Sequence, residues 1–171
     1  MHPLIKPFVE LCLLRALPQD LPTSGLLLGL TLVTHALSSA LLSAFQLGLA
    51  RGLVAGVAET ALLGAMTAGL LALHRLRHRL VQTLTALAGT GTVIGVAALP
   101  VYLWTQGLHG GSGGAGAALL VLLAMVAWSV VITGHILRHA ISGSFFLGLV
   151  LAVVFYWTTV NLLDGLFAAA T

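Results

Sequence analysis

Long apolar runs dominate the chain, and short clusters of charged or turn-forming residues separate them. The runs begin near residues 25, 52, 80, 117 and 145. Each is long enough to cross a bilayer, because a helix needs about 20 apolar residues to span the hydrocarbon core. No run shows the alternating pattern that a transmembrane β-barrel requires. The pattern therefore predicts an all-α polytopic membrane protein, a bundle of five transmembrane helices.

The predicted spans cover residues 25–49, 52–73, 80–104, 117–137 and 145–167, within one transmembrane domain over 25–171. A tight turn around Arg51, between Gly48 and Gly52, divides the first long run into two spans. The basic cluster at 74–79 ends the second span, and the glycine-rich stretch 107–116 separates the third from the fourth.

Residues 1–24 form a separate N-terminal segment. Its apolar part, Pro7 to Leu17, is too short to cross a membrane and lies between prolines. It predicts a short helix in the membrane interface, or a re-entrant element. Thr23 or Ser24 is expected to cap the first span. No small-residue cleavage site follows, so the segment is interpreted as part of the mature protein.

Composition supports lipid as the main solvent. Hydrophobic residues make up 59% of the 171 residues and charged residues only 6%, whereas a soluble domain has about a quarter charged residues. The basic balance rests on only seven Lys and Arg residues, so no nucleic-acid partner is expected. The single cysteine, Cys12, excludes an intramolecular disulfide.

The basic residues predict an orientation. Five spans place nearly all of them on one side, namely Lys6, Arg15, Arg75, Arg77, Arg79 and Arg138, and leave Arg51 alone on the other. Positively charged residues mark the cytoplasmic side. The N-terminus is therefore expected in the cytoplasm and the C-terminus outside.

Small residues recur at intervals of four and predict close helix packing, because helices in lipid associate where backbones can approach. The first span carries Ala36, Ala40, Ala44 and Gly48, and the second carries Gly52, Gly56, Thr60, Gly64, Ala68 and Ala72. The third span adds Gly91 and Gly95. The first two stripes predict a tightly packed hairpin.

Intramembrane polar residues are the main functional candidates, because ionisable groups are costly in a bilayer. Glu59 is the clearest one, in the second span. It is expected to join a polar cluster near the outer side with Asn161, Asp164, Arg51 and Gln46. Such a cluster can be structural, holding helices together by hydrogen bonds, or it can bind a proton or a cation.

Three other residues are expected near the middle of the membrane. His35 lies among hydroxyl residues and predicts an imidazole bonded to one of them, with a haem or proton-relay role as the alternative. Trp128 and Trp157 are expected to fill the core of the bundle, or else to form an aromatic wall for a lipid or quinone.

Two histidine pairs, His74/His78 and His135/His139, have the i, i+4 spacing that places both rings on one helix face. They are candidates for a metal site at the cytoplasmic side. The alternative is that they anchor span ends to lipid headgroups, since arginines surround them.

No catalytic motif is present: the chain has no HExxH, GxSxG or phosphate-binding loop, and only four acidic residues. A non-enzymatic protein without a cofactor is expected. The leading hypothesis is a scaffold, assembly factor or accessory subunit that contacts other membrane proteins or itself. The alternatives are a small ion- or proton-coupled transporter or channel-like oligomer using Glu59, and a metal- or haem-binding subunit.

The layout of five spans after a short N-terminal segment resembles the Yip1 family, over about Pro18 to Phe167. Asp20-Leu21-Pro22 before the first span is similar to the Asp-Leu-Tyr-Gly-Pro stretch of eukaryotic members, without its Tyr-Gly part. The chain is most similar in size to small uncharacterised bacterial members. The resemblance implies a multi-span scaffold in the bacterial inner membrane, and Rab-GTPase binding is not carried over.

Overall fold

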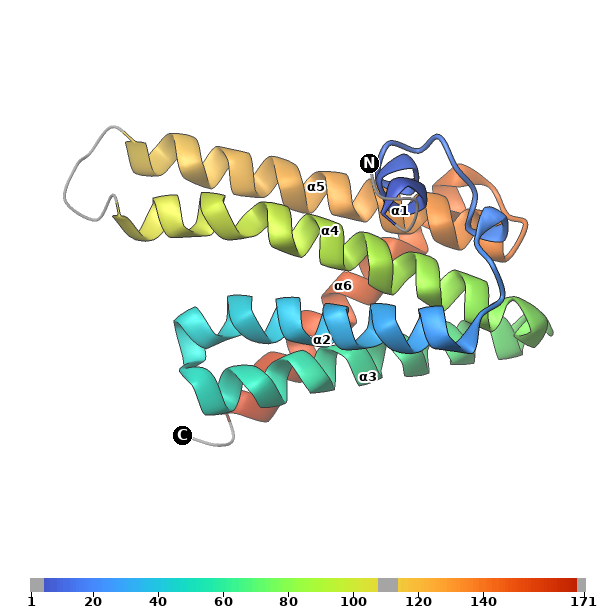
Figure 1. The fold of residues 1–171 in the computed structure, drawn as a ribbon, viewed down its shortest axis with the longest axis horizontal. Helices are drawn as coiled ribbons and strands as arrows, with labels where there is room; N and C mark the ends of the chain where they lie inside the picture. Colours follow the sequence, from blue (N-terminus) through green and yellow to red (C-terminus); the bar gives the residue numbers. More distant parts are fainter. Residues whose placement is uncertain (1–4, 108–113, 169–171) are drawn as a thin grey trace.

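The computed structural model describes residues 5–107 and 114–168, and it consists of helices that lie side by side (Figure 1). The five long helices are α2 (Gly25–Leu47), α3 (Leu49–Leu73), α4 (Leu80–Gly107), α5 (Gly114–Ala140) and α6 (Phe145–Ala168). Each is long and apolar enough to cross a membrane. The prediction of an all-α polytopic bundle with five spans is confirmed.

Three short elements complete the described part of the chain. The helix α1 (Lys6–Cys12) and the 3-10 turn η1 (Pro18–Asp20) precede α2, and the 3-10 turn η2 (Arg77–Arg79) joins α3 to α4. Most of the predicted glycine-rich loop, residues 108–113, lies outside the described residues.

Ser24 caps α2 by accepting a hydrogen bond from the Leu27 N–H at 3.3 Å.

The α2–α3 connection is tighter than predicted. Gly48 alone joins α2 to α3, with φ +80°, which glycine adopts without steric cost. The turn therefore precedes Arg51, which lies in the first turn of α3 and not in the connection. The glycine performs the whole reversal, so no further loop residue is needed.

Small residues bring α2 and α3 into close contact. A Cβ atom added to Gly52 would lie 2.6 Å from the Ala44 Cα, and one added to Gly56 would overlap the Ala36 carbonyl oxygen and lie 2.7 Å from the Ala40 Cβ. Backbone approach of this kind is how helices associate in lipid. Ala36, Ala40 and Ala44 of the first stripe thus face Gly52 and Gly56 of the second stripe within one chain.

The helix α4 forms the centre of the bundle. Every residue from Thr83 to Thr90 is buried, because α1, α2, α3 and α5 all contact α4. From Gly91 onward, towards the end of α4 that carries Gly107, the helix is only partly covered. The change marks the depth at which the packed core gives way to a cavity.

The helix α1 lies against α4 and α5 at the depth of the spans. Phe8 contacts Gly89, which has no side chain to displace it, and the Trp128 indole donates a hydrogen bond to the Cys12 carbonyl oxygen at 3.0 Å. Gly89 is nine residues into α4, roughly 14 Å from its start. The helix therefore packs alongside α4, and its interfacial or re-entrant placement in the membrane stays a prediction. The bond from Trp128 satisfies a carbonyl that the short helix leaves unpaired.

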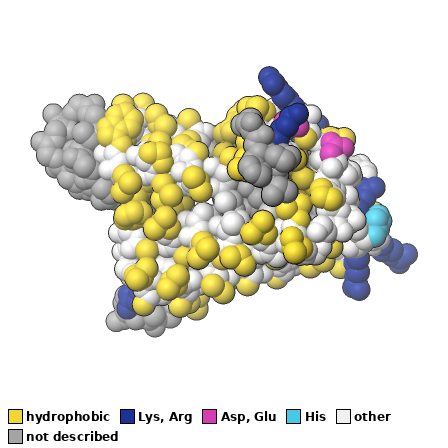
Figure 2. Space-filling view, in the orientation of Figure 1, with side chains coloured by type: hydrophobic (Ala, Val, Ile, Leu, Met, Phe, Trp, Pro, Cys, Tyr) yellow, Lys and Arg dark blue, Asp and Glu magenta, His cyan; other side chains and the backbone are white. Residues whose placement is uncertain are grey.

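Basic side chains gather at one end of the molecule, which is called the basic end below, while hydrophobic side chains cover its flanks (Figure 2). Arg79 holds this end together, because its guanidinium donates to the carbonyl oxygens of His139 and Ala140 and to the Ser142 hydroxyl at 2.9–3.2 Å. Arg138 stacks on Phe145, 5.2 Å from the ring centre. These two arginines therefore have structural roles in the chain.

Candidate functional site

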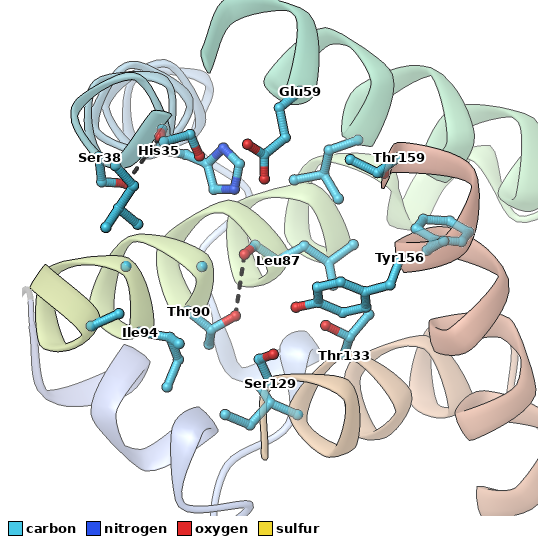
Figure 3. Close-up of a pocket in the computed structure, with 18 residues that line it drawn as sticks. His35, Ser38, Glu59, Leu87, Thr90, Ile94, Ser129, Thr133, Tyr156 and Thr159 are labelled. Atoms are coloured by element: carbon cyan, nitrogen blue, oxygen red, sulfur yellow. Dashed lines mark hydrogen bonds between the residues drawn. The ribbon is translucent and has the colours of Figure 1, made fainter. Parts of the chain in front are cut away.

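A cavity of about 260 Å³ lies near the middle of the bundle, and all five long helices line it (Figure 3). Glu59 is ten residues from the start of α3, roughly 15 Å along the axis. His35 lies near the midpoint of α2 in the same way. The cavity is thus at a depth where a bilayer excludes water, and where polar side chains require partners.

The wall formed by α2 and α3 carries the ionisable groups of the cavity, Glu59 and His35, together with Ser38 and Ser39. Figure 3 shows the Glu59 carboxyl and the His35 imidazole extending into the same space from neighbouring helices. The Ser39 side chain lines the cavity beside Glu59, and the buried Ser38 hydroxyl donates a hydrogen bond to the His35 carbonyl oxygen at 3.0 Å. The close α2–α3 contact is what places these groups together.

Hydrogen bonds around Thr60 fix the tautomer of His35. The Thr60 hydroxyl donates to the Gly56 carbonyl oxygen at 2.8 Å, so its single proton is already used. The same oxygen lies 2.9 Å from His35 Nδ1 and must accept there. Nδ1 therefore carries the proton, and Nε2 of the neutral ring has a free lone pair. The predicted bond between His35 and a neighbouring hydroxyl is present.

The opposite wall is lined by hydroxyl side chains from α4, α5 and α6, namely Thr90, Ser129, Thr133, Tyr156 and Thr159. The sequence analysis did not single out any of them. A usable signal was present in the spacing of four between Ser129 and Thr133, which places two hydroxyls on one face of an otherwise apolar helix.

Two glycines of α4 shape the floor of the cavity beside α2. A Cβ atom on Gly91 would lie 2.7 Å from His35 Cδ2, whereas one on Gly95 would lie 3.4 Å from the Ser38 hydroxyl oxygen. Gly91 thus leaves room for the imidazole, while Gly95 is less constrained. Gly64, on the second predicted stripe, has only an ordinary contact at 3.9 Å with Leu84.

The structure does not bring the predicted outer polar cluster together at Glu59. Asn161 and Asp164 are exposed and are not among the residues that line the cavity, and the Asn161 amide donates to the Trp157 carbonyl oxygen of its own helix at 2.7 Å. Gln46 is exposed as well. Glu59 lies nearer the middle of the bundle than expected, and the rotation of α3 and α6 about their axes directs these side chains to different places.

The tryptophans do not fill the core, and that expectation was wrong. Trp128 is 44% exposed and Trp157 is 68% exposed. Small residues already bring the helices too close to admit an indole between them, so both rings lie on the flank of the bundle. Trp128 uses its N–H to hold α1 instead.

The two histidine pairs are not equivalent. The helix α3 ends at Leu73, and Arg75 has φ +58°, so His74 and His78 do not share a helix face as predicted. His135 and His139 do share one, with ring centres 4.7 Å apart. However, His135 Nε2 lies 3.1 Å from the Ala16 carbonyl oxygen, which uses it structurally. Within residues 5–107 and 114–168, no group of three metal-binding side chains occurs.

Comparison of the chain with protein-family models, with curated proteins and with solved structures finds no match. What the cavity can bind must therefore be inferred from the chemistry of its own side chains.

Proposed function

We propose that the protein is a proton-coupled membrane carrier that binds a small solute in the cavity between its five long helices. The observation that supports this most is the position of Glu59, an acidic side chain near the middle of the bundle, facing a cavity of about 260 Å³. A group of this kind costs energy in a bilayer unless it serves a purpose or is fully paired.

The coupling follows from elementary electrostatics. An isolated carboxylate in a low-dielectric site is unfavourable unless a proton or a cation neutralises it. If the solute and the proton compete for Glu59, binding of one releases the other, and their movements across the membrane are linked. His35 lies beside this carboxyl and offers a second position for the proton at Nε2.

This proposal takes precedence over the scaffold hypothesis for a specific reason. That hypothesis rested on stripes of small residues that could contact a partner. The stripes of α2 and α3 contact each other, with Gly52 against Ala44 and Gly56 against Ala36 and Ala40. The scaffold, assembly and Yip1-like interpretations remain predictions.

We place the basic end in the cytoplasm, because positive residues resist translocation. The N-terminus then lies in the cytoplasm and the C-terminus outside, in a bacterial inner membrane. Fusion of alkaline phosphatase after residue 168 checks this orientation: activity supports an outer C-terminus, and an inactive, expressed fusion contradicts it.

The carrier is tested with proteoliposomes that contain the pH indicator pyranine. A panel of small amines, alcohols and carboxylates is added outside, and the internal pH is followed. The proposal expects at least one solute to change the internal pH faster than in protein-free liposomes, and Glu59→Gln to abolish the difference. Asp164→Asn is the matched control, since it removes one charge from α6 outside the cavity lining. Equal responses from the wild type and Glu59→Gln would refute the proposal.

A further inference from the structure

We infer that the solute is a small primary ammonium ion, a monocation that donates several N–H hydrogen bonds. This inference rests on the proposed solute-binding function and adds to it the chemical class of the ligand. Three of the hydroxyls that line the cavity, those of Ser38, Thr90 and Ser129, have already donated their protons to backbone carbonyls, so what they offer a ligand is lone pairs.

The wall of the cavity formed by α2 and α3 offers hydrogen-bond acceptors. The Ser38 hydroxyl donates to the His35 carbonyl oxygen. A serine hydroxyl has one proton and two lone pairs, so this oxygen can only accept from a ligand, and the Ser39 hydroxyl in the same wall can accept as well. Glu59 as a carboxylate accepts only, and Nε2 of the neutral His35 ring also accepts. This wall therefore presents acceptors around one negative charge.

The opposite wall continues the pattern. The Thr90 hydroxyl donates to the carbonyl oxygens of Ala86 and Leu87 at 2.8 and 3.2 Å, and the Ser129 hydroxyl donates to the Val126 carbonyl oxygen at 2.7 Å. Both hydroxyls are thus left with lone pairs. Thr133, Thr159 and Tyr156 have hydroxyls that can accept or donate, and they do not oppose a cation.

Charge and size define the ligand further. Glu59 is the single acidic side chain of the lining, and Lys and Arg side chains are absent from that lining. The carboxylate can therefore neutralise a ligand with one positive charge, whereas no Lys or Arg of the lining can neutralise an anion. The volume of about 260 Å³ equals roughly nine waters at about 30 Å³ each. That space is too large for a single bare metal ion and suits a small organic molecule. Leu42, Leu63 and Ile94 supply apolar surface for its carbon chain.

The test compares ligands of one shape by isothermal titration of the purified full-length protein in mild detergent. Butylammonium, 1-butanol and butyrate are four-carbon chains that differ in their end group, and tetramethylammonium has the charge without an N–H donor. Butylammonium is expected to bind at least about tenfold more tightly than tetramethylammonium, since hydrogen bonds to charged groups are the strong ones. Butanol and butyrate are expected to bind more weakly still.

Three variants identify the site. Glu59→Gln is expected to lower butylammonium affinity at least about tenfold, and Asp164→Asn to leave it unchanged. Thr90→Val keeps the side-chain shape but removes the lone pairs, and it is expected to lower the affinity about fivefold. Circular dichroism and size-exclusion profiles of each variant establish that it is folded. A folded Glu59→Gln variant that binds butylammonium as well as the wild type overturns the inference.

The remaining outcomes separate this inference from the proposed function. Binding of butyrate or butanol as tight as that of butylammonium overturns the ammonium class and leaves solute binding in place. Tetramethylammonium binding equal to butylammonium overturns the role of N–H donors. If none of the probes binds while a Glu59-dependent pH response persists in proteoliposomes, the ammonium class alone is refuted. If no probe binds and no Glu59-dependent pH response is observed in proteoliposomes, the carrier proposal is refuted as well.

Discussion

Replacement of Gly56 by alanine tests whether the close contact between α2 and α3 holds the cavity residues in place. The added Cβ would overlap the Ala36 carbonyl oxygen and lie 2.5 Å from the Ala40 backbone nitrogen. Ordinary carbon contacts lie at about 3.5–4.0 Å, so the helices must separate by about 1 Å. The obstructing atoms belong to the backbone and cannot rotate away.

The expected cost follows from this geometry. Overpacking of a well-packed core costs about 1–3 kcal/mol, and alanine returns up to about 1 kcal/mol of helix propensity relative to glycine. A net loss of about 1–2 kcal/mol lowers the melting temperature by about 2–8 °C in a chain of this length. Binding of butylammonium is expected to weaken too, since Thr60 and Glu59 lie one turn further along the same helix.

Thermal unfolding in mild detergent, followed by circular dichroism, measures this change. Gly64→Ala is the matched control in the same helix, because its Cβ would meet only a leucine methyl at 3.9 Å. We expect that variant to be as stable as the wild type or slightly more stable. If Gly56→Ala were as stable as Gly64→Ala and bound ligand normally, the close α2–α3 contact would not be what holds the site.

Three further predictions concern α4, the basic end and α1. Gly91→Ala is expected to lower butylammonium affinity about fivefold by displacing the imidazole, whereas Gly95→Ala, whose Cβ would lie 3.4 Å from the Ser38 hydroxyl oxygen, lowers it less in the same titration. Arg79→Gln removes the charge-assisted hydrogen bonds to the His139 and Ala140 carbonyl oxygens and is expected to lower the free energy of unfolding by about 1.5–3 kcal/mol. Arg77→Gln removes the same charge from an exposed side chain and is expected to change the melting temperature little. Equal effects of the two variants would contradict the role of Arg79. Burial raises the pKa of the Cys12 thiol from 9.0 to about 11. Because the thiolate is the reactive form, the rate at which iodoacetamide alkylates Cys12 is expected to keep rising as the pH increases past 9. A rate that levels off near pH 9, as for an exposed thiol, would show that α1 is not docked.

The sequence was sufficient for features that depend on local chemistry. Long apolar runs define the five helices, Ser24 caps the first of them, and Gly48 is a residue that can reverse the chain at φ +80°. Hydrogen bonding of His35 to a hydroxyl could be expected as well, because an imidazole in lipid needs a partner and hydroxyl residues surround it in the sequence.

The rotation of each helix about its axis could not be predicted. Helices that are apolar on all sides have no polar face to orient them, so depth along the axis was known while direction was not. For this reason Asn161 and Asp164 were grouped with Glu59, although they are exposed elsewhere. The prediction that His74 and His78 share a helix face was wrong for a different reason, because α3 ends at Leu73, before both residues.

The position of the hydroxyl oxygens at one cavity is what only the structure supplies. Thr90 and Ser129 lie in apolar helices, where a hydroxyl commonly donates to a carbonyl oxygen one turn back. In the structure each proton is donated to a backbone carbonyl, and the oxygen remains at the cavity. Each of these bonds is made within one helix, and what the structure adds is that the hydroxyl oxygens of different helices meet at one cavity.

The most direct test of a proton-coupled cation site is the number of protons released when butylammonium binds. The purified protein is titrated in weakly buffered detergent solution with a pH indicator, alongside Glu59→Gln and Asp164→Asn. The account predicts that the wild type and Asp164→Asn release protons on binding, up to one per ligand, and that their affinity falls as the pH is lowered. Glu59→Gln is predicted to release none. Binding that releases no proton from the wild type at any pH between 5 and 9, or equal release from Glu59→Gln, would contradict it.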